Sequence, residues 1–257
     1  MITTGVVLSG GGIRGFAHLG LLQVMDECGI KPHAISGVSA GAIAGAFYAS
    51  GHKPQQIMEI LKKSSYFGWS AFSLRKDGFF SMKTLLSTLK VYIPHDSFES
   101  LRTPLFITAT DFTNNRTAVF SKGKLFDAII ASCSVPVLFE PVKIGNSLFV
   151  DGGLLNNLPV EPLGGICDIL VGCHVNRIGP ETIAKKRIGK INIIEKCFHM
   201  AIANIIYEKA KKCDLFIEPQ LHKYGMFDMN KSDIIYETGY REALKYKNRL
   251  LDLTEDT

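Results

Sequence analysis

The feature that most restricts the fold of this chain is an uncharged stretch from Ala34 to Gly51, AISGVSAGAIAGAFYASG. Its glycines at positions 37, 41 and 45 have a four-residue spacing, which is typical of helices that pair inside membranes. The same stretch contains GVSAG around Ser39, the G-x-S-x-G pattern of a turn that presents a nucleophilic serine between a strand and a helix. The stretch is therefore either a membrane span or the centre of an active site.

Two properties argue against a membrane span. With four glycines and three serines the stretch is weakly hydrophobic, and it barely reaches the length of a membrane-crossing helix. It also begins as a strand, HAISG, so it is not one continuous helix. We therefore expect a short strand, a turn at Ser39, and a buried helix from about Ala40 to Ser50 that packs closely on a sheet.

The flanking segments predict an α/β fold. The β-branched run TGVVLS at the start reads as a buried strand, and FAHLGLLQVMDEC reads as a helix that ends at Gly29. The first fifty residues are thus strand-helix-strand-helix, a pattern that favours a parallel sheet with helices on its faces. We predict a three-layer α/β/α architecture with a mainly parallel central sheet, and one domain over residues 1–257.

Later elements follow from the same patterns. We expect strands at 103–112, 116–121, 147–153, 168–175 and 214–219, the first two joined as a hairpin, and helices at 53–64, 82–93, 125–135, 191–213 and 231–253, the last capped by Asn230.

Composition excludes several classes of protein. The chain is 46% hydrophobic and 21% charged, as in ordinary globular domains. Its net charge of +5 is too small to indicate nucleic-acid binding, although it is compatible with anionic lipid surfaces. The start of the chain does not resemble a secretory signal, and the six cysteines lack the spacing of zinc ligands. We expect reduced cysteines and a cytoplasmic location, with peripheral contact at the inner membrane face as the alternative.

A glycine-rich loop, SGGGIRG, joins the first strand to the first helix. Gly10, Gly12 and Gly15 match the G-x-G-x-x-G pattern of dinucleotide sites, but such a site also needs an acidic residue at the end of the second strand, where this chain has Ser39. Backbone amides at a helix N-terminus still favour an anion, including the oxyanion of acyl transfer. A tight turn without a function is the alternative.

A Ser-acid-His triad is poorly supported. In α/β-hydrolases the elbow normally follows several strands, whereas Ser39 follows the second predicted strand. Among the later histidines, His174 ends a predicted strand and His199 lies within a predicted helix, and neither clearly stands in a catalytic loop. A histidine-assisted esterase that uses one of these residues or His222 is kept as an alternative.

An aspartate later in the chain offers another base. The stretch FVDGGLLNNLPV places Asp151 at the end of a predicted strand, before two glycines. Because the carboxyl ends of parallel strands meet at one edge of a sheet, we expect the glycine loop, Ser39 and Asp151 to meet there. A carboxylate in contact with a serine hydroxyl can act as a general base without histidine. An Asp-Gly turn without a function is the alternative.

The ordered set GGGIRG, GVSAG and DGG resembles the pattern of the patatin-like phospholipase family, and the resemblance extends from about Gly5 to Lys247. It implies a lipid acyl hydrolase that cleaves a lipid or phospholipid ester through an acyl-serine, without a metal or cofactor. The site residues that it implies are Ser39 as nucleophile, Asp151 as base, Gly37 and Gly41 at the elbow, the amides of Gly10, Gly11 and Gly12 as oxyanion hole, and Arg14 and Gly15 as support of the loop. Ser134 stands where the family often has alanine. A non-enzymatic lipid-binding or regulatory protein on the same fold is the alternative.

Two further segments bear on lipid contact. The aromatic-rich segment from Tyr66 to Phe80 is expected to form core or pocket wall, with membrane contact as the alternative. The basic residues Lys185, Lys186, Arg187 and Lys190 are expected in a solvated loop, with anionic lipid as the alternative partner.

Overall fold

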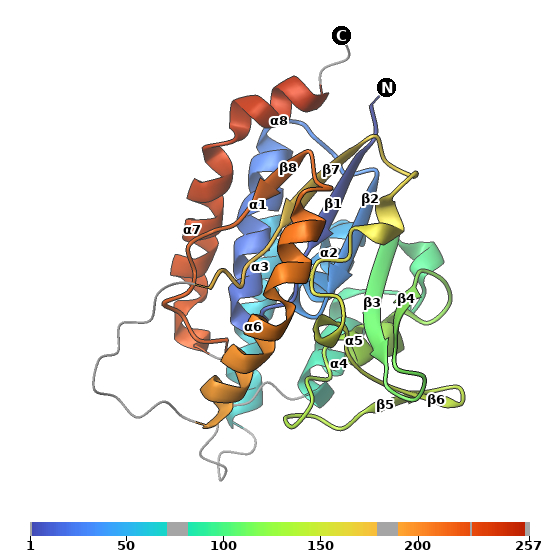
Figure 1. Cartoon of the computed structure of the whole chain (residues 1–257). Coiled ribbons are helices and arrows are strands. Elements are labelled where there is room, and N and C mark those ends of the chain that lie inside the picture. Colours follow the sequence, from blue (N-terminus) through green and yellow to red (C-terminus); the bar gives the residue numbers. More distant parts are fainter. Residues whose placement is uncertain (1, 71–81, 179–189, 227, 255–257) are drawn as a thin grey trace, which may run out of the picture.

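The computed structural model describes residues 2–70, 82–178, 190–226 and 228–254, whose strands form one mixed eight-stranded sheet (Figure 1). The strands are β1 (Thr4–Leu8), β2 (Ala34–Val38), β3 (Leu105–Asp111), β4 (Arg116–Phe120), β5 (Val142–Ile144), β6 (Ser147–Asp151), β7 (Ile169–Cys173) and β8 (Leu215–Ile217). They are ordered β5-β6-β3-β2-β1-β7-β8, and β4 also pairs with β3.

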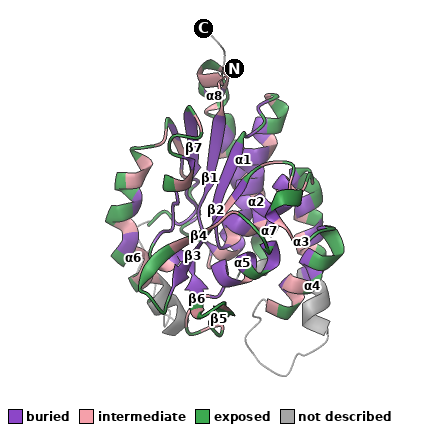
Figure 2. Ribbon diagram, turned by 90° about the vertical axis from the view of Figure 1, so that its right-hand side faces the viewer, coloured by how far each residue is buried: buried purple, intermediate pink, exposed green. Residues whose placement is uncertain are grey.

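Helices cover both faces of this sheet, which confirms the three-layer prediction. They are α1 (Phe16–Glu27), α2 (Ala40–Ala49), α3 (Pro54–Ser70), α4 (Met82–Tyr92), α5 (Leu125–Ser132), α6 (Lys190–Ala210), α7 (Ser232–Leu244) and α8 (Lys247–Thr254). In Figure 1, α6 lies on one side of the sheet, while α1, α3 and α7 lie on the other. Figure 2 shows that the central strands and much of α1 and α2 are buried between these layers.

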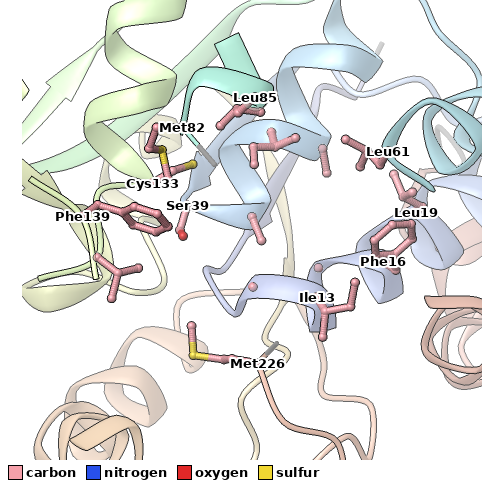
Figure 3. Close-up of a pocket in the computed structure, with 16 residues that line it drawn as sticks. Ile13, Phe16, Leu19, Ser39, Leu61, Met82, Leu85, Cys133, Phe139 and Met226 are labelled. Atoms are coloured by element: carbon pink, nitrogen blue, oxygen red, sulfur yellow. The ribbon is translucent and has the colours of Figure 1, made fainter. Parts of the chain in front are cut away.

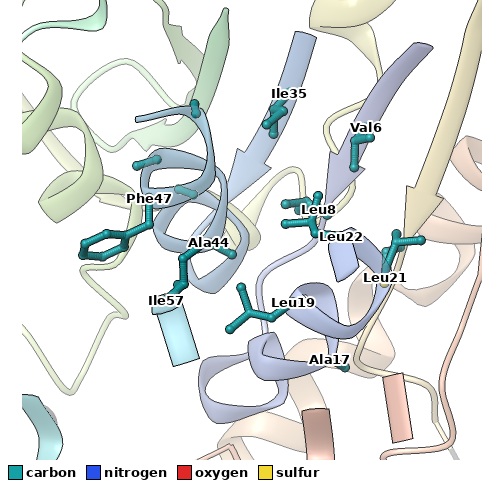
Figure 4. Close-up of a cluster of buried hydrophobic side chains, with 14 of the residues drawn as sticks. Val6, Leu8, Ala17, Leu19, Leu21, Leu22, Ile35, Ala44, Phe47 and Ile57 are labelled. Atoms are coloured by element: carbon teal, nitrogen blue, oxygen red, sulfur yellow. The ribbon is translucent and has the colours of Figure 1, made fainter. Parts of the chain in front are cut away.

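The strand β1 shows how the sequence builds the two cores. Val6 and Leu8 belong to the larger core, which they share with α1, α2 and α3 (Figure 4). Val7 belongs to the smaller core, under α6. Successive side chains of a strand point to opposite faces, so a continuous apolar run is what a strand buried on both faces requires.

The sheet is parallel in its centre and antiparallel at one side. The five strands β3, β2, β1, β7 and β8 run parallel to one another. The strands β4 and β6 each run antiparallel to β3, and β5 runs antiparallel to β6. The predicted β3–β4 hairpin is confirmed, whereas the short strand β5 was not predicted.

The direction of β6 corrects one step of the sequence reasoning. Asp151 does end a strand, but that strand is antiparallel to β3, so it does not reach the carboxyl edge as a parallel strand would. It stops instead beside Ala109, while Val38 at the end of β2 pairs with Thr108. The strand β4 pairs with residues 107–111 of β3, so β2 and β6 both lie along the opposite edge of β3, β2 at residues 105–108 and β6 at 109–111. The ends of β2 and β6 therefore meet on one edge of β3, which brings Ser39 and Asp151 together.

The C-terminal segment differs from its prediction. In place of one helix over 231–253, the chain forms α7 and α8, which are separated at Lys245 and Tyr246. Asn230 is not the cap, because it lies in a 3₁₀ turn from Met229 to Lys231, and α7 has Lys231 at its N-cap position.

The two segments proposed for lipid contact fall largely outside the described residues. Of the aromatic-rich segment, the backbone of Tyr66 to Ser70 continues α3, and residues 71–81 are outside. Lys185, Lys186 and Arg187 are also outside, while Lys190 begins α6. In the parts of the chain that the structure describes, no helix combines the length and the apolar character needed to cross a bilayer.

Candidate active site

Ser39 occupies a strained turn between β2 and α2. Its backbone has φ of 52° and ψ of −120°, a region that non-glycine residues rarely adopt and that costs about 1–3 kcal/mol. The amide of Ser39 donates to the Ser132 hydroxyl at 2.8 Å, and that hydroxyl donates to the Thr108 carbonyl at 2.7 Å. The strained residue is thus held by the end of α5 and by β3.

The glycines on either side of Ser39 are required by close backbone approach. A Cβ atom at Gly37 would lie 2.6 Å from the Gly41 carbonyl oxygen, and one at Gly41 would lie 2.2 Å from the Leu8 carbonyl oxygen. Both distances are far below van der Waals contact. The first turn of α2 therefore rests directly on the end of β1, as the elbow prediction requires.

Asp151 is a buried carboxylate in contact with Ser39. Its side chain accepts a hydrogen bond from the Gly153 amide at 2.7 Å. Burial raises the pKa of Asp151 to about 6, and the nearby Ser39 hydroxyl and the Gly153 amide oppose that rise. A carboxylate with such a pKa can exchange a proton near neutral pH.

The glycine loop lies beside this pair, and its three amides are not equivalent. The Gly10 amide already donates to the Asn157 side-chain oxygen at 3.0 Å. Gly11 and Gly12 have φ of 156° and 58°, both in the region that favours glycine. Among the hydrogen bonds of the described residues, none uses the amide of Gly11 or Gly12. Of the three predicted oxyanion donors, the structure therefore leaves Gly11 and Gly12 available and engages Gly10.

Arg14 and Gly15 connect the loop to its surroundings. The buried Arg14 side chain donates from Nε to the Tyr224 carbonyl at 2.8 Å and from Nη1 to the Asn176 side-chain oxygen at 3.1 Å. A Cβ atom at Gly15 would lie 2.6 Å from the Cβ of Ala40. Arg14 thus ties the loop to the segments around Asn176 and Tyr224, and Gly15 allows the loop to approach α2 closely.

An apolar pocket, here called the α1–α2 pocket, opens beside Ser39 (Figure 3). Its empty volume is about 910 Å³, including space open to solvent. Figure 3 shows Phe139 near Ser39 at one end, and Leu19 and Leu61 toward the other. The remaining lining residues are Gly12, Ile13, Gly15, Phe16, Ala40, Ile43, Ala44, Met82, Leu85, Cys133, Val135 and Met226.

A second pocket, here called the Asp151 pocket, meets the first at Ser39. It has an empty volume of about 820 Å³, again including open space, and its wall holds Asp151, Asn157 and His199. Its other lining residues are Gly10, Gly11, Val135, Pro136, Val137, Leu138, Gly153, Leu154, Phe198 and Met226. The nucleophile candidate thus stands at the junction of the two pockets, and the second of them holds the Asp151 carboxyl group.

The three histidines of the alternative mechanism are placed differently. His174 is buried and pairs through Nδ1 with Glu218 at 2.8 Å, and burial lowers its pKa. The side chain of His222 is exposed and does not line either of the two pockets at Ser39. His199 lines the Asp151 pocket, so it is the histidine that the structure brings nearest to the candidate pair.

Several residues of the site were not singled out by sequence reasoning. Asn157 lies in the stretch DGGLLNNLPV, and Ser132 and Cys133 lie in ASCSVPVLFEP. Both stretches are part of the family resemblance, which was the one signal that could have indicated these residues. Burial raises the pKa of the Cys133 thiol well above its usual range, so this neighbour of Ser39 is a neutral thiol and not a second nucleophile. Ser134 packs in the buried interior as expected, and its carbonyl accepts from the Asp151 amide at 2.9 Å.

No group of three or more His, Cys, Asp or Glu residues that could hold a metal ion occurs in the described part of the chain.

Comparisons with known proteins identify the family of this chain. A family model described as patatin-like phospholipase matches residues 6–163. An uncharacterized NTE family protein of Mycobacterium tuberculosis is 28% identical over 188 residues, which are 71% of this chain and 52% of that protein. Lysophospholipase NTE1 of Cryptococcus neoformans is 32% identical over 179 residues, 65% of this chain and 11% of that protein. The chain therefore spans about half or less of the length of these curated relatives.

A likeness to a solved structure supports the fold. The structural match to the crystal structure of VipD from Legionella pneumophila covers 97% of this chain and 67% of the VipD chain. It has a TM-score of 0.58 and 14% sequence identity. At that identity the likeness concerns the arrangement of helices and strands.

The buried carboxyl group predicts an unusual pH dependence of stability. In the folded chain Asp151 holds its proton up to a pH of about 6, whereas in the unfolded chain it releases it near 3.8. The free energy of unfolding therefore falls as the pH rises between these values, by about 3 kcal/mol. Asp151→Asn should remove this loss, so that the variant is more stable than the parent at pH 7.5 and the gain disappears below pH 4.

Urea unfolding at a series of pH values measures this difference, with Asp252→Asn on the exposed side of α8 as the control. An Asp151→Asn variant that is less stable than the parent at pH 7.5 would contradict the assignment of a destabilising buried charge.

Proposed function

The chain belongs to the patatin-like phospholipase family, and on that premise we propose that it hydrolyses carboxylic esters of lipids through Ser39 and Asp151. The observation that carries this proposal is that the Ser39 hydroxyl and the buried Asp151 carboxyl line the same pocket, close enough for the hydroxyl to lower the pKa of the carboxyl. The Cryptococcus relative is named a lysophospholipase, which supports a monoacyl phospholipid as one substrate.

The chemistry follows from the roles of the two side chains. As Ser39 Oγ attacks the ester carbonyl carbon, its proton passes to the Asp151 carboxylate. The carbonyl oxygen becomes an oxyanion, and the amides of Gly11 and Gly12 stabilise its charge. The bond to the leaving alcohol then breaks, Asp151 returns the proton to that alkoxide, and an acyl-Ser39 ester remains.

Hydrolysis of the acyl-enzyme repeats the proton transfer. Water attacks the acyl carbon while Asp151 accepts a proton from it, and the second tetrahedral intermediate collapses by breaking the bond to Ser39 Oγ. Asp151 gives the proton back to the serine, so the free carboxylic acid leaves and the site returns to its starting state. The strained backbone of Ser39 is consistent with a nucleophile that the fold holds in advance of the reaction.

The two pockets suggest how the substrate lies. The α1–α2 pocket, lined by aliphatic, aromatic and sulfur-containing side chains, suits the acyl chain. We assign the leaving alcohol to the Asp151 pocket, because that pocket contains the residue that must return a proton to the alcohol.

A second mechanism is favoured by one feature, the presence of His199 in the Asp151 pocket. In that mechanism the imidazole is the base and Asp151 supports it. The two mechanisms share the nucleophile and differ in which substitution abolishes proton transfer.

The pH dependence of turnover tests the proposed base. Because Asp151 must be ionised to accept the serine proton, kcat on a p-nitrophenyl ester should rise with pH through an apparent pKa of about 6. Folded Ser39→Ala and Asp151→Asn variants should each lose at least about 1,000-fold in kcat. Normal turnover by Asp151→Asn would contradict the dyad, and failure of the parent protein to hydrolyse any lipid or model ester would favour a lipid-binding protein instead.

Ala44 tests the placement of the acyl chain. This residue lies in α2 and lines the α1–α2 pocket, so Ala44→Leu should shorten the space available there. We expect kcat/KM for dodecanoyl esters to fall about 10-fold or more while butyrate esters are cleaved nearly as before, since each buried methylene contributes about 0.8 kcal/mol. The measurement is a chain-length series of p-nitrophenyl esters.

The matched control for Ala44→Leu is Leu154→Phe, which narrows the Asp151 pocket. It should leave the chain-length profile unchanged and reduce activity on esters with bulky alcohols. The opposite assignment of the two pockets would be supported if Leu154→Phe changed chain-length preference and Ala44→Leu did not.

A further inference from the structure

Two asparagine side chains bind Gly10, one through its backbone N–H and the other through its carbonyl oxygen. Asn157 Oδ1 accepts from the Gly10 amide at 3.0 Å, and Asn176 Nδ2 donates to the Gly10 carbonyl at 2.6 Å. Each asparagine is only 3% exposed. Asn157 follows β6 and Asn176 follows β7. The two asparagines are separated from Gly10 by 147 and 166 positions in the sequence, yet both bind this one glycine.

The bond from Asn176 also orients the next amide. The carbonyl of Gly10 and the N–H of Gly11 belong to one planar trans peptide unit, so the two groups point in opposite directions. When Asn176 holds the carbonyl, the Gly11 N–H is turned away from Asn176. Gly11 lines the Asp151 pocket together with Ser39, and no hydrogen bond given for the described residues engages its N–H.

Arg14 decides which end of the Asn176 amide faces Gly10. Arg14 Nη1 donates to Asn176 Oδ1 at 3.1 Å, and a guanidinium has only donors to offer. The oxygen of the amide must therefore face Arg14, which leaves the NH₂ group for the Gly10 carbonyl. Arg14 is itself anchored through Nε to the Tyr224 carbonyl at 2.8 Å and is 8% exposed.

The geometry points to Asn176 as a positioning residue for ester hydrolysis: held by Arg14, it turns the Gly10–Gly11 peptide unit so that the Gly11 N–H faces the developing oxyanion. This inference rests on the proposed function of Ser39. It adds a residue outside the three family motifs and explains why a buried arginine next to a glycine loop matters for the reaction. The effect is directional, because a hydrogen bond weakens steeply as its angle departs from linear.

The test is Asn176→Asp, which keeps the size of the side chain and its contact with Arg14 but replaces the donor to Gly10 by an oxygen. Since loss of one oxyanion donor lowers kcat by about 100- to 1,000-fold, a misdirected donor should lower it by about 10- to 100-fold. KM should change by less than about threefold, because the donor acts mainly on the transition state. Affinity for an alkyl boronic acid, which forms a tetrahedral adduct with a serine, should fall in parallel with kcat.

The matched control is Asn156→Asp, one residue before Asn157. Asn156 donates to Glu161 and accepts from Lys209, and it lines neither pocket, so kcat and boronic acid affinity should stay at the parental values. A second variant, Asn176→Ser, retains a hydroxyl that is too short to reach the Gly10 carbonyl and should reproduce the loss if Asn176→Asp does not fold.

The outcomes separate this inference from the function on which it rests. A folded Asn176→Asp or Asn176→Ser variant with parental kcat would overturn the role of Asn176 and leave Ser39 and Asp151 untouched. A rise in KM at constant kcat would also overturn it, because that pattern indicates substrate binding. If the parent protein neither hydrolyses esters nor reacts with the boronic acid, the proposed function itself fails.

Discussion

The first turn of α2 lies against the end of β1, and this backbone contact fixes the distance between the candidate nucleophile and the glycine loop. Gly41 allows it, because a Cβ atom there would meet the Leu8 carbonyl oxygen at 2.2 Å. The glycine loop begins two residues after Leu8, and Ser39 precedes Gly41 by two. Any side chain at position 41 would push α2 off the sheet and move Ser39 away from the amides that are proposed to stabilise its reaction. The uncharged stretch from Ala34 to Gly51 is therefore the packing surface that makes the site.

Around that contact the fold accepts groups that are unfavourable for stability. Ser39 is held at a strained φ, and Asp151 is buried so far that its pKa rises to about 6. Each feature opposes folding by an amount comparable to a few kcal/mol, and each is useful to a nucleophile or a base that works near neutral pH. Ser132 accepts a hydrogen bond from the Ser39 amide, and the Gly153 amide donates one to the Asp151 carboxylate. These bonds hold the two groups in place, and the large apolar core supplies the stability that those groups reduce.

Local patterns made most of the fold and the positions of the two candidate catalytic residues predictable. The strand-helix-strand-helix start, the turn at Ser39 and the position of Asp151 at the end of a strand follow from runs of a few residues whose hydrophobicity and glycines act locally. The direction of β6 and the existence of β5 did not follow, because strand pairing is a long-range choice that a three- or five-residue strand does not encode. The positions of Asn157 and Asn176 beside Gly10 likewise depend on contacts between segments about 150 residues apart.

The central claim is that Asp151, and not a histidine, takes the proton of Ser39. The most direct measurement is the rate at which a fluorophosphonate labels Ser39, followed by peptide mass spectrometry, in the parent and in folded Asp151→Asn and His199→Ala variants. The account predicts that the label is on Ser39, that Asp151→Asn slows labelling by at least about 100-fold, and that His199→Ala labels at nearly the parental rate. Loss of labelling in His199→Ala with normal labelling in Asp151→Asn would contradict it.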